Sequence, residues 1–251
     1  GSDNTVTFDL SASPLVINSG QSKYVYAYAD TAAGINTSRT VIFEITQATD
    51  VDAYGSNSGG GVTITYSIGT AFSRQTGATM TINQGTLSFS LDSATNPAVQ
   101  SYVLGTTNRL WAAFKFSTGS TEGVRVTEVT LTKTGTGSAT DISNITLYDG
   151  STAIASGSMV GSTVKFGANT IGWDSAGGLF DIPASTNKVI TVKADVPSGA
   201  TAANTLGLKI NALADIKADG LTSQYDLPTA SAFGSPAPNG NNHIVATSGS
   251  L

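Results

Sequence analysis

The chain has 251 residues, a formal net charge of −5 at pH 7, and charged side chains at only 12% of its positions. Its 12 Lys and Arg residues are spread singly, so we expect no basic patch and no binding to nucleic acid. The absence of cysteine excludes disulfides and thiolate metal sites. No apolar run reaches 18 residues, and we expect no membrane insertion.

Apolar and polar residues alternate along nearly every apolar segment, which predicts β-strands with one face in the core. In chain order, the alternating segments are 24–29, 41–45, 87–91, 110–116, 129–131, 145–147, 189–194 and 206–212. Gly-rich turns separate them, and the Asp149-Gly150 pair predicts a hairpin. No helical stripe longer than about a turn occurs. The pattern predicts an all-β fold of sandwich modules.

The chain contains one segment twice. A gapless offset of 165 residues places 17–55 over 182–220, with apolar residues aligned to apolar ones. Ten positions are identical, namely Ile17, Lys23, Ala29, Asp30, Gly34, Thr40, Ile45, Asp50, Ala53, Gly55 and their counterparts. Such agreement indicates an internal repeat and therefore tandem β-sandwich modules.

The repeat predicts which side of each strand faces the core. In the second copy, Ile190, Val192, Leu206, Leu208 and Ile210 are expected inside. In the first copy, the same alternation places Val25, Ala27, Phe43 and Ile45 inside. Leu110, Ala112, Phe114 and Phe116 are expected to point inward, with Trp111 on the outer face.

The repeat also predicts the modules. Residues 84–87 match 248–251 at an offset of 164, so 85–251 is expected to be a complete module. Residues 1–84 match only the C-terminal half of that unit, so the first module is incomplete. Two explanations remain open: the chain is a fragment of a longer tandem array, or a neighbouring chain donates the missing strands.

Aromatic and apolar residues of the incomplete module are the candidate interface. Tyr24, Tyr26 and Tyr28 are expected on the outer face of one strand, and Phe8 and Leu10 are expected to be partly uncovered. A row of exposed tyrosines serves a subunit interface, a sugar-stacking platform, or cross-strand packing under a local loop. The sequence leaves all three open.

Trp111 and Trp173 are candidates for stacking on a polysaccharide; the alternative is that either tryptophan closes one end of a sandwich. Asp50, Asp52, Asp215 and Asp219 lie in predicted loops and are weak calcium candidates, with backbone-capping in turns as the other role. Two glycosylation sequons begin at Asn36 and Asn144. No resident cofactor is expected.

Catalytic motifs are not found. The single histidine, His243, stands alone in a Pro- and Asn-rich tail, and the three glutamates form no recognisable pair with another carboxylate. We therefore expect no enzymatic activity.

The repeated VITVKADVPSGA-type strand, the NITLYDGSTAI hairpin and the Thr/Gly-rich turns resemble the tandem immunoglobulin-like or cohesin-like sandwich modules of prokaryotic cell-surface proteins. The resemblance implies an extracellular protein that associates with itself or with neighbouring modules. It implies a structural subunit of a surface layer or filament, and alternatively an adhesin that binds glycan or a partner protein. It assigns no functional residues.

Overall fold

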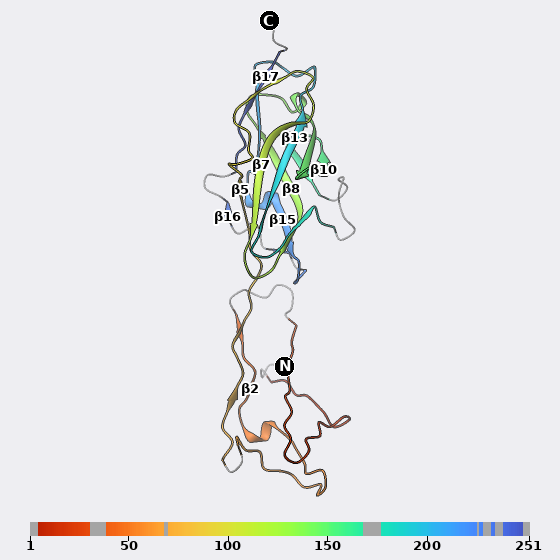
Figure 1. Cartoon of the computed structure of the whole chain (residues 1–251), viewed down its shortest axis with the longest axis vertical. Coiled ribbons are helices and arrows are strands. Elements are labelled where there is room, and N and C mark those ends of the chain that lie inside the picture. The colour runs from red at the N-terminus through yellow and green to blue at the C-terminus, as the bar shows by residue number, and fades with distance from the viewer. Residues whose placement is uncertain are drawn as a thin grey trace. The chain divides into compact units, whose positions relative to one another are not determined.

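The computed structural model describes residues 5–30, 39–67, 70–167, 177–224, 226–227, 232–233 and 238–247. Two compact units divide the chain, an N-terminal unit Gly1–Ile82 and a C-terminal unit Asn83–Leu251. The described residues form β-strands and three single-turn 3-10 helices, with no α-helix among them (Figure 1). The predicted all-β class is confirmed.

One sheet of the C-terminal unit has six strands in the order β10-β9-β13-β7-β5-β16. Their bounds are β5 Leu87–Leu91, β7 Arg109–Thr118, β9 Ser143–Asp149, β10 Thr152–Gly157, β13 Asn187–Asp195 and β16 Ala232–Phe233. All pairs are antiparallel except β16 with β5. The predicted hairpin joins β9 to β10, where Asp149 pairs with Thr152 across a two-residue turn. Gly150 has a φ of 59°, which glycine tolerates without strain.

The second sheet has seven strands and is centred on β8, Val124–Thr134. The others are β6 Ser101–Val103, β11 Thr163–Phe166, β12 Phe180–Ile182, β14 Thr205–Lys209, β15 Ile216–Gly220 and β17 His243–Ala246. Because β8 is 11 residues long, it pairs with β11 and β12 along one edge and with β14 and β15 along the other.

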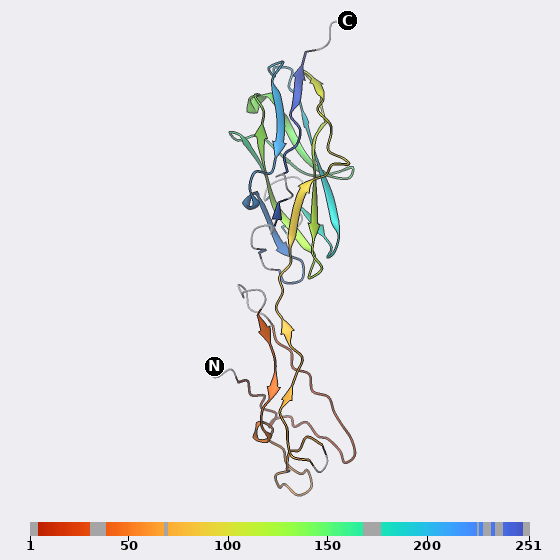
Figure 2. The same cartoon turned by 90° about the vertical axis from the view of Figure 1, so that its left-hand side faces the viewer.

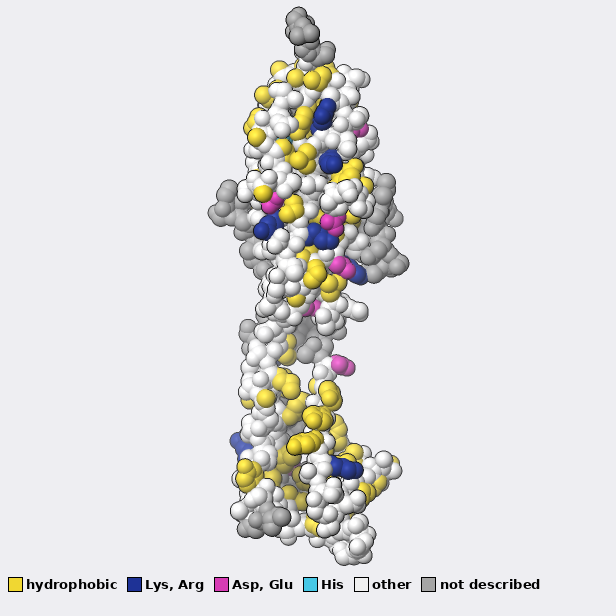
Figure 3. All heavy atoms as spheres, viewed as in Figure 1, with side chains coloured by type: hydrophobic (Ala, Val, Ile, Leu, Met, Phe, Trp, Pro, Cys, Tyr) yellow, Lys and Arg dark blue, Asp and Glu magenta, His cyan; other side chains and the backbone are white. Residues whose placement is uncertain are grey.

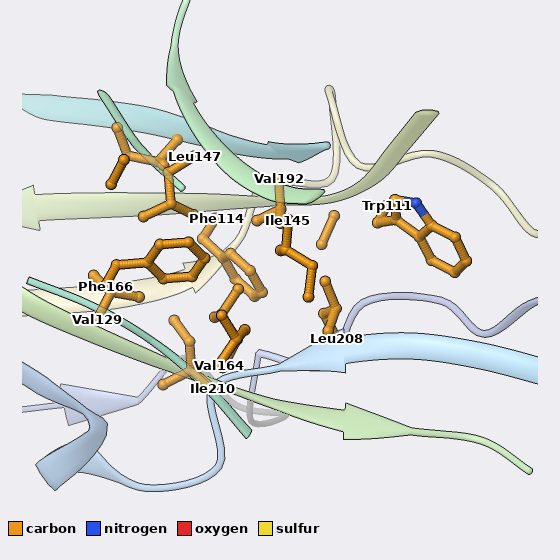
Figure 4. Packing of buried hydrophobic residues seen from close by; sticks show 14 of the residues in the cluster. Trp111, Phe114, Val129, Ile145, Leu147, Val164, Phe166, Val192, Leu208 and Ile210 are labelled. Atoms are coloured by element: carbon orange, nitrogen blue, oxygen red, sulfur yellow. The ribbon is translucent and has the colours of Figure 1, made fainter. Parts of the chain in front are cut away.

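The two sheets pack face to face as a β-sandwich (Figure 2). Phe114 and Val192 of one sheet, Leu208 of the other and Ile210 just after β14 belong to one hydrophobic core (Figure 4). The inward positions predicted from the repeat, Ile190, Val192, Leu206, Leu208 and Ile210, are each at most 1% exposed. The predicted faces of β13 and β14 are confirmed.

The orientation of Trp111 differs from the one that the alternation in β7 predicts. Val192 pairs with Ala112 but Lys193 pairs with Leu110, so Trp111 is the extra residue of a β-bulge. A bulge reverses the inside–outside alternation on one side of it. Trp111 therefore points inward and is fully buried, and the prediction that it faces outward is wrong.

The described residues of the N-terminal unit form only short strands: β1 Thr40–Val41, β2 Glu44–Ile45, β3 Gln75–Thr76 and β4 Met80–Thr81. β1 pairs with β4, and β2 pairs with β3. None of its described residues is buried. The prediction that Val25, Ala27, Phe43 and Ile45 share a core within this chain is wrong, because no second layer covers them here.

Candidate assembly interface

The C-terminal unit consists of two interleaved halves. We call the strands β5 to β11, residues 87–166, the first half, and the strands β12 to β17, residues 180–246, the second half. Every strand of the second half pairs with a strand of the first: β12, β14 and β15 with β8, β13 with β7 and β9, β16 with β5, and β17 with β6. The second half thus depends on the first for most of its described strand pairing.

Few of the pairings between described residues lie within the second half itself. β14 pairs with β17, aligning Thr205 with Ile244 and Leu206 with His243. Two isolated bridges join Lys209 to Asn239 and Asp219 to Asp226.

The N-terminal unit contains counterparts of the three internal pairings found among the described residues of the second half. Thr40 pairs with Thr81 and Val41 with Met80, as β14 pairs with β17. Glu44 pairs with Thr76 as Lys209 pairs with Asn239, and Tyr54 bridges Gly61 as Asp219 bridges Asp226. Residue numbers in the two copies differ by 165 up to Gly61, and by 163 for Thr76, Met80 and Thr81. At these pairings, the described residues of the N-terminal unit therefore follow the backbone path of a second half.

One turn recurs with its side-chain contacts. Helix η1, Ala48–Asp50, and helix η3, Leu213–Asp215, each end on an aspartate. Asp50 Oδ2 accepts hydrogen bonds from the Thr46 and Gln47 amides, at 2.8 and 3.1 Å. Asp215 Oδ2 accepts from the Asn211 and Ala212 amides, at 2.9 and 2.8 Å. Both aspartates cap the backbone, which is the turn role left open by the sequence.

The counterpart of β13 differs. Residues 22–30 form no strand, whereas β13 lies between β7 and β9. Val25 is 75% exposed, while its counterpart Ile190 is 1% exposed. Figure 3 shows hydrophobic side chains, in yellow, at the surface of the N-terminal unit. These side chains lack the layer that the first half supplies in the C-terminal unit.

The predicted interface residues lie on this uncovered unit. Tyr24, Tyr26 and Tyr28 are 86%, 71% and 87% exposed, and the rings of Tyr24 and Tyr26 are 6.5 Å apart between centroids. Phe8 and Leu10 are more than half exposed. Large apolar side chains in such a group mark contact surfaces more often than free surfaces.

Glu122 joins the two halves at one end of the C-terminal unit. Its carboxylate accepts hydrogen bonds from the amides of Gly85, Thr222 and Ser223 and from the Ser223 hydroxyl. Burial raises the pKa of Glu122, but these hydrogen bonds outweigh burial and hold the pKa below its ordinary value. The carboxylate is thus kept ionised as a cap for the turn at 221–223.

Other predicted candidates are dispersed. Trp111 is buried, and its Nε1 donates to the Ala194 carbonyl oxygen at 3.2 Å, so it offers no stacking surface. Trp173 and Asn36 lie outside the described residues. Asn144 is exposed, and its amide donates to Asp195 Oδ2 at 2.8 Å.

The calcium candidates do not converge. Asp52 accepts from the Tyr54 hydroxyl at 3.1 Å. Burial, with the neighbouring carboxyl of Asp226, raises the pKa of Asp219. Within the described ranges, no group of three or more His, Cys, Asp or Glu residues could hold a metal ion.

Comparison with known proteins gives no relative: no family model, no curated protein and no solved structure matches the chain. Among the helices that the structure describes, none is long and apolar enough to span a membrane.

Proposed function

We propose that the protein is an extracellular structural subunit that assembles through its β-sandwich modules into a surface layer or filament. One observation carries the proposal: the N-terminal unit has the backbone path of a second half, without the first half that covers its apolar face. Uncovered apolar surface and unpaired strand edges both favour association. The proposal assigns no catalytic role.

The low charge content supports an extracellular location. Charged residues make up 12% of the chain, and Gly, Ser, Thr, Ala and Asn supply much of the rest. With no cysteine available for disulfides, stability must come from the core and from contacts between modules.

An adhesin that binds glycan is the second candidate. The adjacent, exposed rings of Tyr24 and Tyr26 favour it, because sugars stack on accessible aromatic faces. The buried position of Trp111 removes one of the aromatic residues first assigned to such a site.

The test is the assembly state of the purified protein as its concentration rises, measured by light scattering and electron microscopy. We expect ordered polymers, and we expect the double variant Tyr26→Ser, Tyr28→Ser to need about tenfold or more protein to form them, since buried interface aromatics often contribute over 1 kcal/mol each. Tyr66→Ser, at an exposed tyrosine outside the row, is the control. Monomers at every concentration that bind glycans through these tyrosines would favour the adhesin instead.

A further inference from the structure

We propose that the N-terminal unit is completed by the first half of a further module of this repeat, a segment with the strand pattern of 87–166. The inference names the partner of the surface described above and rests on the proposed assembly. The partner adds strands equivalent to β7, β8 and β9, and it converts the N-terminal unit into a sandwich like the C-terminal one.

Strand pairing gives the first reason. Among the described residues, the N-terminal unit retains each pairing that the second half makes internally and shows none of those made with the first half. Residues 40–44 and 51–55 correspond to β14 and β15, which both pair with β8. Residues 22–30 correspond to β13, which lies between β7 and β9. The unpaired edges of the N-terminal unit thus correspond to the edges that pair with β7, β8 and β9 in the C-terminal unit, which fixes the order and direction of the three missing strands.

Core composition gives the second reason. The structure describes fifteen buried apolar positions between 179 and 245 of the second half. Of their fifteen counterparts, only Thr31, opposite Val196, is polar. The others are Pro14, Leu15, Ile17, Val25, Ala27, Ala29, Ile35, Val41, Phe43, Ile45, Val51, Ala53, Val62 and Ile82. Hydrophobic residues make up only 39% of the chain, so this agreement indicates side chains suited to a buried layer.

A polar contact adds specificity. The turn 56–58 corresponds to 221–223, and the Gly59 amide donates to the Gly55 carbonyl as the Gln224 amide donates to Gly220. In the C-terminal unit, this turn binds the Glu122 carboxylate. A first half seated on the N-terminal unit would place its own acidic residue against Asn57 and Ser58. An extended apolar peptide of unrelated sequence would not provide this carboxylate.

Stoichiometry argues against a second copy of residues 1–251 as the partner. Each copy carries one first half and, in effect, two second halves. If one copy pairs its first half with the N-terminal unit of another copy, its own second half loses its covering layer. Exchange between copies therefore always leaves one second half uncovered. The missing layer must come from an additional first half.

The experiment joins residues 83–165 directly before residue 1 of the full chain. Because residue 1 corresponds to residue 166, this fusion keeps the spacing found within the C-terminal unit. Amide hydrogen exchange is then measured at 22–30, with 187–195 as the internal reference for a completed module. We expect exchange at 22–30 to slow by at least about 100-fold relative to the unfused chain, because strand pairing converts freely exchanging amides into protected ones.

Two variants make the result specific. Leu131→Asp in the added segment alone places a charge at a core position of β8 and should abolish the new protection. Val25→Asp should lower the thermal midpoint in the fusion and leave that of the unfused chain unchanged, while Tyr66→Asp should change neither. Unchanged exchange at 22–30 in the fusion, with no effect of Val25→Asp, would overturn the inference.

Other outcomes are distinguishable. Protection of 22–30 in the unfused chain that rises with protein concentration would identify a second copy as the partner and overturn the inference. A fusion that gains protection supports the inference whether or not the unfused protein polymerises. The absence of polymers from the unfused chain would instead count against the proposed assembly.

Discussion

His243 is fully buried between two aromatic rings, with its own ring 4.9 Å from Tyr102 and 5.4 Å from Trp111 between centroids. Its Nδ1 accepts a hydrogen bond from the Gln100 amide at 3.2 Å, so Nε2 carries the proton and donates to the Trp111 carbonyl oxygen at 3.1 Å. Burial lowers the pKa of His243, and the hydrogen bond to Trp111 only partly opposes this. The folded protein therefore holds this histidine neutral.

This arrangement predicts a loss of stability under mild acid. Below the ordinary histidine pKa of 6.5, His243 binds a proton more readily in the unfolded chain than in the folded one. The free energy of unfolding therefore falls as the pH is lowered. We expect urea midpoints to decline between about pH 6.5 and 5, above the range where most carboxylates titrate.

The matched variant is His243→Met, since Met80 is the counterpart in the N-terminal unit. It should flatten the decline between pH 6.5 and 5 even if its stability at pH 7 is lower. An unchanged slope in the variant would show that another group is responsible.

Sequence patterns predict the apolar residues better than these polar ones. Alternation alone places Ile190 and Leu208 in the core, because the period of a strand is fixed. The partners of His243 and Glu122 come from residues about 100 or more positions away in most cases, so no local pattern signals them. Their burial could be recognised only once the sheets were assembled.

At the scale of elements, the bulge in β7 shows where local periodicity stops being sufficient. One extra residue opposite β13 turns Trp111 into the core, where its ring contacts Tyr102 edge-on at 5.1 Å. Nothing in the alternation of Leu110, Ala112 and Phe114 signals the extra residue. The bulge becomes visible only from the pairing of two strands that lie far apart in sequence.

We predict that Trp111→Ala destabilises the protein by about 3–5 kcal/mol, because it leaves a large cavity and deprives the Ala194 carbonyl of a donor. Trp111→Phe should be milder, since it keeps an aromatic ring beside Tyr102 and His243. Urea unfolding followed by circular dichroism measures both changes. A Trp111→Ala variant with an almost unchanged free energy of unfolding would contradict the buried position and favour the outward orientation that alternation predicts.

The repeat was more informative about turns than about strands in the N-terminal unit. The aspartate-capped turns at 48–50 and 213–215 form in both copies because their hydrogen bonds lie within a few residues. Residues 22–30 share the alternation of β13 and still form no strand, since both neighbours of β13 come from the first half. Alternation specifies a face, but a strand also requires a partner.

At the scale of the whole molecule, the two units differ in how much of their surface they bury. The C-terminal unit has a continuous core that spans both sheets, whereas no described residue of the N-terminal unit is buried. Cooperative unfolding depends on such a core, and a segment without one contributes little enthalpy when it loses its structure.

Calorimetry of the dilute, unassembled chain should therefore detect only the C-terminal unit. Unfolding enthalpy near 60 °C is about 0.7 kcal/mol per residue, which gives about 120 kcal/mol for Asn83–Leu251 and about 175 kcal/mol for all 251 residues. We expect the smaller value, in one transition, because the N-terminal unit lacks its first half. In the fusion that carries the added first half, the unfolding enthalpy should exceed that of the unfused chain by more than the added residues alone contribute, because the N-terminal unit then folds as well. A dilute chain that already gives the larger value would mean that the N-terminal unit folds without a partner, and the incomplete-module explanation would fail.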